Sequence, residues 1–403
     1  MSFLWCLATL IWKPKPLIPI EDRLSALPDS ILCHILSFLT TKDSAATSIL
    51  SKRWNSLWLS VFTIDLVANK LSDIKTFDSV ILLRDIKVPI QKLRLKYNAR
   101  VKRLRYDVDV LISQYCRDHI NPLITAAFER GLETLELDMQ LAPLCVQFAS
   151  GIFSCKTLTV LKLRHLKIVI EDLPRINTSP LKTLHLDHVT FRCHTHIINF
   201  LLSFPTLEEL QANVVGVRKF FQQKETIKCS PNLIRASVSD SEAISLFLLS
   251  KAVTLTINLT STYLMRIEHT WFRFPTFHNL TQIELVFKYD SKKKWRWMLE
   301  MLHQSPKLQH LIINEKMEYG DGEDNWQDPT VVPECLSSQL KTCLIRNCRG
   351  QKSDLQFAEF VMRNSKVLRT MTIHSSCSIL LKAKFMVLHK LSPYPRNCKL
   401  IFE

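Results

Sequence analysis

Few residues of this chain have the types and spacing that chemistry requires. The one cluster of metal-ligand types is Cys193-His194-Thr195-His196, with His185 and His188 nearby. Residues one or two apart on a strand or loop seldom converge on a zinc ion without a fourth ligand of known spacing. We therefore predict no metal site and no bound cofactor.

Sequence motifs of enzymes are absent. The chain has only six glycines, and it lacks a Gly-x-Gly-x-x-Gly run, a Walker loop, a Gly-x-Ser-x-Gly elbow and a His-Glu-x-x-His pair. An acidic stretch has the wrong spacing for a calcium loop; its members are Glu315, Glu318, Asp321, Glu323, Asp324 and Asp328. We expect a solvated acidic linker over residues 315–331, and we predict that the chain is not an enzyme.

The composition is that of a globular protein with a strong positive charge. Of 403 residues, 47% are hydrophobic and 22% are charged, and the formal net charge is +16. This length allows two domains, or one solenoid with an appendage. The twelve cysteines are spread singly without a Cys-x-x-Cys pair, which indicates reduced thiols in a protein of the cytoplasm or nucleus.

Basic residues gather in several runs. Residues 292–297 (KKKWRW) are the best candidate for nucleic-acid binding, because tryptophan rings could stack on bases between the charges. No recognised nucleic-acid-binding motif surrounds this run. We favour a solvated basic face as the explanation.

The N-terminal extension, residues 1–20, has two explanations. Residues 3–12 are mostly apolar but too few to span a bilayer, and no basic residue precedes them. Prolines at positions 14, 16 and 19 then indicate an extended linker. We favour an incidental extension over a weak signal sequence, and no other apolar run approaches the length of a membrane span.

The elements that could position functional residues begin with residues 27–39 (LPDSILCHILSFL), whose apolar side chains recur at steps of three and four. This spacing predicts a helix with one apolar face, and Pro28 and Asp29 suit its first turn. Asp43 or Ser44 can cap a second helix, and a third follows. Three short helices cannot bury so many large side chains among themselves. The surplus predicts either a partner protein or packing against the rest of the chain.

This stretch resembles the F-box of plant proteins, from residues 22–29 (DRLSALPD) through residues 50–58 (LSKRWNSLW). The F-box family binds the Skp adaptor of a cullin-based ubiquitin ligase, so the resemblance implies an F-box over residues 21–66. Thr40 stands where the family usually has proline, and we expect it to adjust the turn without abolishing docking. Carried over by position, the residues that should face the adaptor or the helix core are Leu27, Pro28, Ile31, Leu32, Ile35, Leu36, Leu50, Trp54 and Leu57.

Downstream, a three-residue apolar pattern recurs about every 26 residues. Eight copies start at Leu132, Leu158, Leu181, Leu207, Leu233, Ala252, Leu280 and Leu308, and Ile90 fits an earlier one. Such irregular leucine-rich repeats predict a solenoid in which each unit adds one strand to a parallel sheet. Prolines at 180, 205, 231 and 306 predict the turns into the strands. An ordinary α/β domain with chance leucine spacing would not repeat this turn chemistry.

Alternate residues of each predicted strand should face the concave surface of the sheet. They are Glu136, Asp138, Lys162, Arg164, His185, Asp187, Gln211, Asn213, Glu284, Ile312 and Asn314. A curved sheet of this kind is a recognition surface and not a catalytic pocket. We hypothesise that a protein substrate binds there. The candidate contacts are Arg164, His185, Asp187 and Gln211.

The C-terminal segment, residues 332–403, resembles the FBD domain that follows leucine-rich repeats in plant F-box proteins. The resemblance rests on residues 332–336 (VPECL), 340–345 (LKTCLI), a helical run at 354–363, and 365–373 (SKVLRTMTI). The units at 340 and 368 keep the leucine pattern, so we expect this segment to cap the solenoid.

The whole sequence predicts an α/β protein: a three-helix F-box, a leucine-rich-repeat solenoid over residues 67–314 with its parallel sheet on the concave face, and an FBD cap. The resemblance implies the substrate-recognition subunit of an SCF-type E3 ubiquitin ligase, without catalysis of its own. Its expected partners are the Skp-type adaptor and, through it, cullin and RING subunits. The alternatives are a protein that uses the F-box for assembly only and a nucleic-acid-associated repeat protein.

Overall fold

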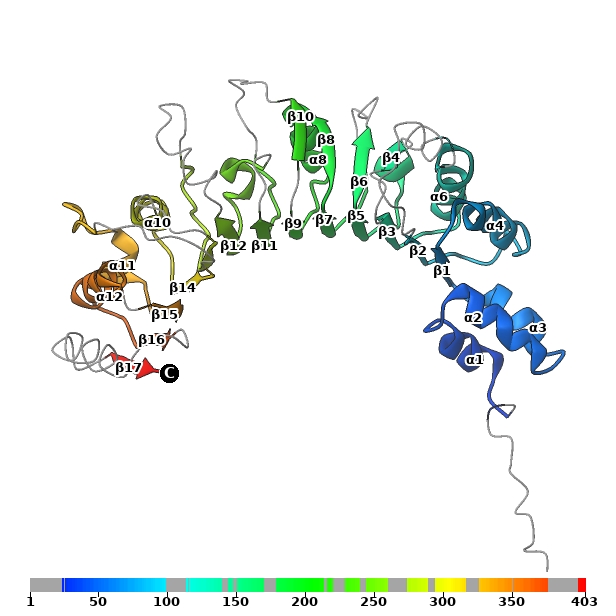
Figure 1. Ribbon diagram of the computed structural model, residues 1–403, viewed down its shortest axis with the longest axis horizontal. Coiled ribbons are helices and arrows are strands. Elements are labelled where there is room, and N and C mark those ends of the chain that lie inside the picture. Colours follow the sequence, from blue (N-terminus) through cyan, green and yellow to red (C-terminus); the bar gives the residue numbers. More distant parts are fainter. Residues whose placement is uncertain are drawn as a thin grey trace, which may run out of the picture.

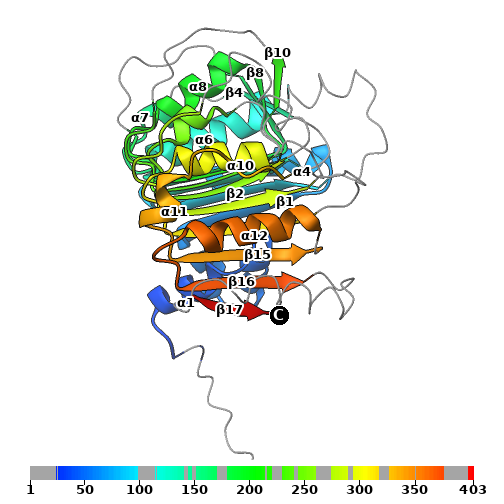
Figure 2. The same cartoon turned by 90° about the vertical axis from the view of Figure 1, so that its left-hand side faces the viewer.

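The protein is an arch of parallel strands with a helical module at its N-terminal end (Figure 1). Strands line the inner curve of the arch and helices cover its outer side. Seen from the side, the strands run next to one another along the sheet (Figure 2). The computed structural model describes residues 24, 26–98, 114, 116–139, 144–147, 151–169, 179–213, 216–219, 229–239, 244–259, 274–288, 294–316, 326–349, 351–375 and 398–403.

The described residues form a main sheet of 13 strands, in which every neighbouring pair is parallel. Its strands, in order, are β1 (Thr63–Ala68), β2 (Lys92–Tyr97), β3 (Thr134–Met139), β5 (Val160–Arg164), β7 (Thr183–Asp187), β9 (Glu209–Asn213), β11 (Arg235–Ser239), β12 (Thr254–Leu259), β13 (Gln282–Phe287), β14 (His310–Glu315), β15 (Thr342–Cys348), β16 (Thr370–Ser375) and β17 (Lys399–Phe402). Stacked units that each contribute a strand produce this order. The predicted α/β solenoid is confirmed.

Shorter elements complete each repeat. A second parallel sheet contains β4 (Leu144–Gln147), β6 (Leu166–Val169), β8 (Thr190–Cys193) and β10 (Gly216–Lys219). The N-terminal module contains α1 (Asp29–Leu36), α2 (Thr41–Ala46), η1 (Thr47–Ile49), α3 (Trp54–Leu57) and η2 (Trp58–Ser60). The other helices are α4 (Leu71–Leu82), η3 (Cys116–Ile120), α6 (Asn121–Glu129), α7 (Gly151–Ser154), α8 (His194–Leu202), η4 (Leu246–Leu249), α10 (Lys294–His303), α11 (Glu334–Ser338) and α12 (Lys352–Asn364).

The apolar positions of the repeats form one continuous core behind the main sheet. Along β3, Leu135, Leu137 and Met139 are buried, and the side chains between them face the concave side. Equivalent leucines lie in register on neighbouring strands, as Leu135 does with Leu161 of β5. All nine predicted copies, including the one from Ile90, contribute a strand to this sheet.

The sheet extends beyond the predicted repeat boundaries in both directions. β1 lies partly within the range expected for the F-box and pairs with β2. β15, β16 and β17 carry the sheet through the segment expected to cap the solenoid. The C-terminal segment therefore continues the solenoid, because its strands pair with the repeats through the same parallel hydrogen bonds.

The acidic stretch does not begin in solvent as the sequence predicts. Glu315 is the last residue of β14 and is buried against Lys294 of α10. Lys294 Nζ also lies 3.4 Å from Asp354 Oδ1 of α12. Burial and the nearby Asp354 carboxylate raise the pKa of Glu315, although the Lys294 charge opposes them. Residues 317–325 of the expected linker lie outside the described part of the chain.

The described part of the basic run considered for nucleic-acid binding, residues 294–297, lies in α10, and residues 292 and 293 lie outside the described part of the chain. Trp295 and Trp297 of α10 are buried. The Trp295 ring stacks on Phe357 of α12, with ring centroids 5.0 Å apart. These rings are unavailable to bases, so the nucleic-acid alternative gains no stacking surface from the described part of the run. The favoured interpretation, a solvated basic face, is wrong for Lys294, which is buried as well. Helical spacing of large apolar residues along α10 outweighs the charges beside them.

Candidate functional site: the N-terminal helices and the concave face

The N-terminal module has a small core of its own. Five buried side chains form it: Leu32, Leu36, Trp54, Leu57 and Val61. Leu27 is partly buried against this cluster. Four of the nine residues named from the sequence as adaptor or core positions are thus inside the module. A partner cannot touch them in this arrangement, so their role is to hold the helices in place.

Other large apolar side chains of the module remain exposed. They are Ile31, Ile35, Phe38, Leu39, Ile49 and Leu50, and we call them the outer apolar residues. Phe38 is 77% exposed and Ile49 is 88% exposed, which is unusual for side chains of this size. Ile31 and Ile35 are four residues apart in α1 and so lie on one side of the helix, and Leu39 follows in the turn after it. Pro28, also exposed, is the N-cap of α1.

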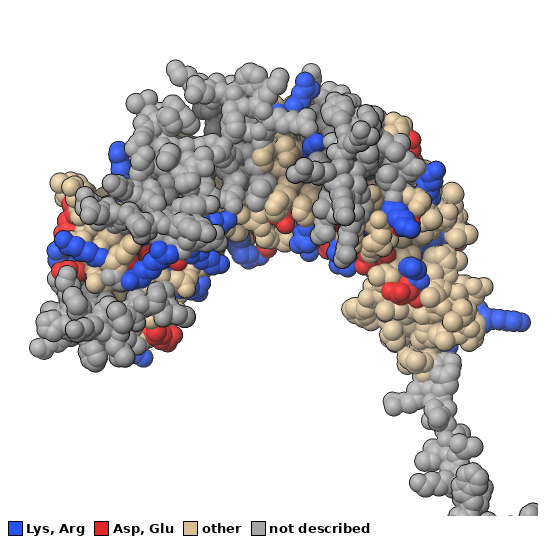
Figure 3. Space-filling view, in the orientation of Figure 1, with Lys and Arg blue, Asp and Glu red and all other residues tan. Residues whose placement is uncertain are grey.

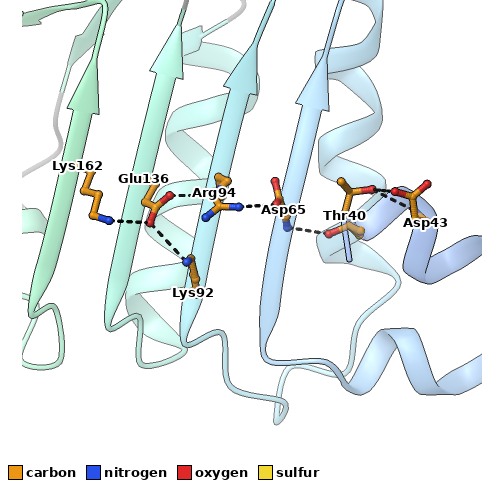
Figure 4. Close-up of polar contacts among 8 residues, drawn as sticks. Thr40, Asp43, Asp65, Lys92, Arg94, Glu136 and Lys162 are labelled. Atoms are coloured by element: carbon orange, nitrogen blue, oxygen red, sulfur yellow. Dashed lines mark hydrogen bonds and ion pairs between the residues drawn. The ribbon is translucent and has the colours of Figure 1, made fainter. Parts of the chain in front are cut away.

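Polar contacts fix the turns between the module's helices. Arg53 Nε donates to Asp29 Oδ1 at 2.8 Å, which ties the start of α3 to the start of α1. Thr40 Oγ1 accepts from the Asp43 N–H at 3.2 Å and donates to Asp43 Oδ2 at 2.7 Å (Figure 4). Thr40 is therefore the N-cap of α2, and neither of the two residues predicted for that role is. Its φ of −63° is one that proline also adopts.

Two joints hold the module to the arch. The Asp65 N–H of β1 donates to Thr41 Oγ1 at 2.8 Å. Arg84, buried just after α4, donates through Nη2 to the Trp58 carbonyl at 3.0 Å and through Nη1 to the Val61 carbonyl. Burial lowers the pKa of Arg84 to about 10, which leaves it a cation at neutral pH. Neither joint buries the outer apolar residues, which stay exposed.

Charged side chains form a ladder across the first strands of the concave face (Figure 4). Arg94 donates to Asp65 Oδ2 at 3.0 Å and to Glu136 Oε2 at 2.8 Å. Lys92 Nζ and Lys162 Nζ each lie 3.4 Å from Glu136 Oε1. Desolvation would raise the pKa of Glu136, but the hydrogen bond from Arg94 and the three cationic charges lower it to about 2. Glu136 is therefore ionised at neutral pH.

The four candidate substrate contacts lie together beside this ladder. Arg164 of β5 is in register with Asp187 of β7, and His185 of β7 with Gln211 of β9. Arg164 is exposed and the other three are half-buried. Desolvation and nearby cations lower the pKa of His185, against the Glu209 carboxylate, so the ring is neutral at pH 7. The sequence thus placed these residues correctly, and substrate contact stays a prediction.

The concave face changes character along the arch. In the middle row of each strand, the four positions after the ladder are neutral and polar: His185, Gln211, Ser237 and Thr256. Near the C-terminal end the same row consists of Ile312, Leu344, Thr372 and Ile401. The middle row is thus charged near the module and mainly apolar at the far end, with Glu284 of β13 as one more charge between Thr256 and Ile312.

Metal chemistry finds no support in the described ranges, where no group of three or more His, Cys, Asp or Glu side chains could hold an ion. The Cys193–His196 run is divided between the end of β8 and the start of α8. Within the same ranges, no helix has the length and apolarity to cross a bilayer.

Comparisons with known proteins agree with this organisation. The F-box domain model matches residues 24–63, and the FBD model matches residues 327–373. Two F-box/FBD/LRR-repeat proteins of Arabidopsis thaliana are each 26% identical, one over 95% of this chain and 93% of its own length, the other over 88% and 87%. An FBD-associated F-box protein of the same plant is 27% identical over 94% of this chain and all of its own length. The chain is thus a plant-type F-box/leucine-rich-repeat protein with a C-terminal FBD domain.

Proposed function

We propose that the chain is the substrate-recognition subunit of an SCF-type ubiquitin ligase. The F-box binds a Skp-type adaptor and, through it, cullin and RING subunits, while the concave sheet holds a protein substrate. The chain itself performs no catalysis. We further propose that it works in the cytoplasm, the nucleus or both.

The observation that carries this proposal is the set of outer apolar residues. The module's five-residue core and its two joints to the arch leave these six side chains in water. Covering an isoleucine or leucine is worth about 1.5–3 kcal/mol. A partner surface that covers several of them at once gains enough to form a stable complex, as interfaces centred on buried apolar anchors do.

Tethering explains how a chain without catalytic groups accelerates ubiquitin transfer. The arch would hold a substrate lysine at a high effective concentration near the charged conjugating enzyme, so that a bimolecular step becomes nearly intramolecular. The nucleic-acid alternative is not favoured, because the tryptophans that prompted it are buried.

Calorimetric titration of the full chain with a purified Skp adaptor tests the proposal. Ile35→Asp should weaken adaptor binding at least tenfold, about 1.4 kcal/mol or more, because it places a charge in an apolar contact. The matched control is Ile234→Asp, just before β11 and far from the module: Ile35 is 39% exposed and Ile234 is 42% exposed.

Control binding equal to that of the unmutated chain supports the proposal. No binding by the unmutated chain, or equal loss in both variants, would overturn it. Adaptor binding without ubiquitylation of any captured protein in the reconstituted ligase would instead favour an F-box used for assembly only.

A further inference from the structure

Five cations stand on two strands of the concave face, Lys92, Arg94 and Lys96 on β2 and Lys162 and Arg164 on β5; we call them the cationic patch. We propose that the cationic patch binds an acidic segment of the substrate protein. This inference rests on the proposed function, and it adds the chemical class of the substrate.

Charge is in excess at the patch. Strand β3 presents two carboxylates between β2 and β5, Glu136 and Asp138, and Asp65 of β1 and Asp187 of β7 flank the patch, so five cations face four carboxylates. Figure 3 shows basic side chains along the inner curve of the arch, with acidic ones among them. The low pKa of Glu136 and the lowered pKa of His185 beside the patch are both partly due to these cations.

The cationic side chains are also more exposed than the carboxylates between them. The side chains of Glu136 and Asp138 are 18% and 17% exposed, whereas those of Lys92, Arg94 and Lys162 are 35%, 41% and 34% exposed. Long stems lift the cationic groups above the shorter acidic side chains. A ligand approaching the sheet therefore meets positive charge first.

The existing ion pairs leave donors for a ligand. An ammonium group carries three N–H donors, and one contact with Glu136 uses at most part of this capacity at Lys92 and Lys162. On the outer row, Asp138 lies in register between Lys96 and Arg164, but its carboxylate contacts His165 Nδ1 at 3.1 Å. Lys96 and Arg164 are thus placed to bind a carboxylate brought by a partner.

The spacing of the patch fits a polypeptide better than a nucleic acid. β2 and β5 are two strand intervals apart, about 10 Å, which an extended peptide spans in three residues. An extended peptide in the polyproline-II conformation has three residues per turn, so acidic side chains at every third residue lie on one face. They would reach both cationic strands and pass over β3. A nucleic acid carries a phosphate at each step and binds best to an uninterrupted basic stripe. The carboxylates of β3 interrupt this one.

Fluorescence anisotropy on the full chain bound to its adaptor tests the inference. The probe is a labelled twelve-residue peptide with glutamate at every third position, and the reference is the same peptide with glutamine. We expect tighter binding of the glutamate peptide and at least a fivefold loss of affinity in Arg164→Glu. The matched control is Arg192→Glu on β8 of the second sheet, also exposed, which should stay within twofold.

Equal affinity for the two peptides, or equal effects of the two substitutions, would overturn the inference. Tighter binding of a twelve-nucleotide single strand than of the glutamate peptide would also overturn it, in favour of nucleic acid. Adaptor binding separates this failure from failure of the proposed function: the F-box complex would persist in every Arg164→Glu measurement even if the patch binds no peptide.

Discussion

The N-terminal module and the arch differ in how much of their apolar surface they bury. The module buries five side chains and leaves six large apolar ones in water, while the arch buries its leucines in one continuous core and turns mainly charged and polar residues inward along the concave curve. A small unit whose apolar side chains are only partly buried fits the proposed binding of one constant partner. A long polar face can vary residue by residue without loss of the fold, which suits a substrate surface.

The largest effect is expected where the arch departs from this rule and buries charge. In Lys294→Met, Glu315 and Asp354 lose their cation, and the free energy of unfolding should fall by about 3–5 kcal/mol. Urea denaturation measures it. Arg296→Met on the exposed side of α10 is the control, expected within about 0.5 kcal/mol. Equal effects of the two would show that the buried cluster contributes nothing specific.

A smaller loss, confined to the module, is expected for Leu36→Ala. Truncating this fully buried side chain should remove about 2–5 kcal/mol from the module. Few bonds join module and arch, so hydrogen exchange should quicken in α1 and α3 and stay unchanged in β5 and β7. Faster exchange throughout the sheet would mean that the two regions unfold as one unit.

The charged ladder predicts a pH dependence of the arch. The pKa of Glu136 is about 2 in the folded chain and near 4.5 when unfolded, so its contribution is present above pH 4.5 and is lost as the pH falls toward 2. Denaturation of the unmutated chain and of Glu136→Gln should differ by about 1–3 kcal/mol at pH 6 and converge by about pH 2. A constant difference across this range would contradict the ladder.

The smallest effect concerns the departure from the usual F-box pattern. Thr40→Ala removes the cap of α2 and should lower the stability of the module by about 1 kcal/mol. Thr40→Pro keeps the backbone angle and should leave adaptor affinity within twofold. A large loss of adaptor binding in Thr40→Pro would show that the threonine itself contacts the partner.

Much of the arch follows from local pattern, and much of the site does not. Strand positions such as Leu135 and Leu161 are predictable from the sequence. Alternation of apolar residues shows which side chains face the core, and recurrence of the unit shows which residues of neighbouring strands are paired. The apolar face of α1 is broad and includes neighbouring residues, so Leu36 inside and Ile35 outside look alike in sequence. Phe38 and Ile49 are not among the candidate adaptor contacts predicted from the sequence. Both are large apolar residues near the end of a helical stretch, and that position is a usable signal of exposure.

Long-range pairing explains the remaining differences. Lys294 and Glu315 are predicted from the sequence to be solvated charges. Their ion pair joins an outer helix to the end of a strand, and sequence periodicity does not predict that contact. The leucine pattern at 340 and 368 indicates that the C-terminal segment caps the solenoid, but only the pairing with β14 shows that it extends the same sheet. Thr40 is a departure from the family motif that the sequence predicts to adjust the turn, and its capping role depends on the turn that forms around it.

Hydroxyl-radical footprinting of the chain, free and bound to a Skp adaptor, tests the central claim most directly, since it reports the exposure of individual side chains. The account predicts that Ile35, Phe38, Ile49 and Leu50 lose reactivity on binding, while the exposed Ile234 and Val367 of the arch keep theirs. Unchanged reactivity of all four module residues in a formed complex, or protection spread over the concave strands, would contradict it.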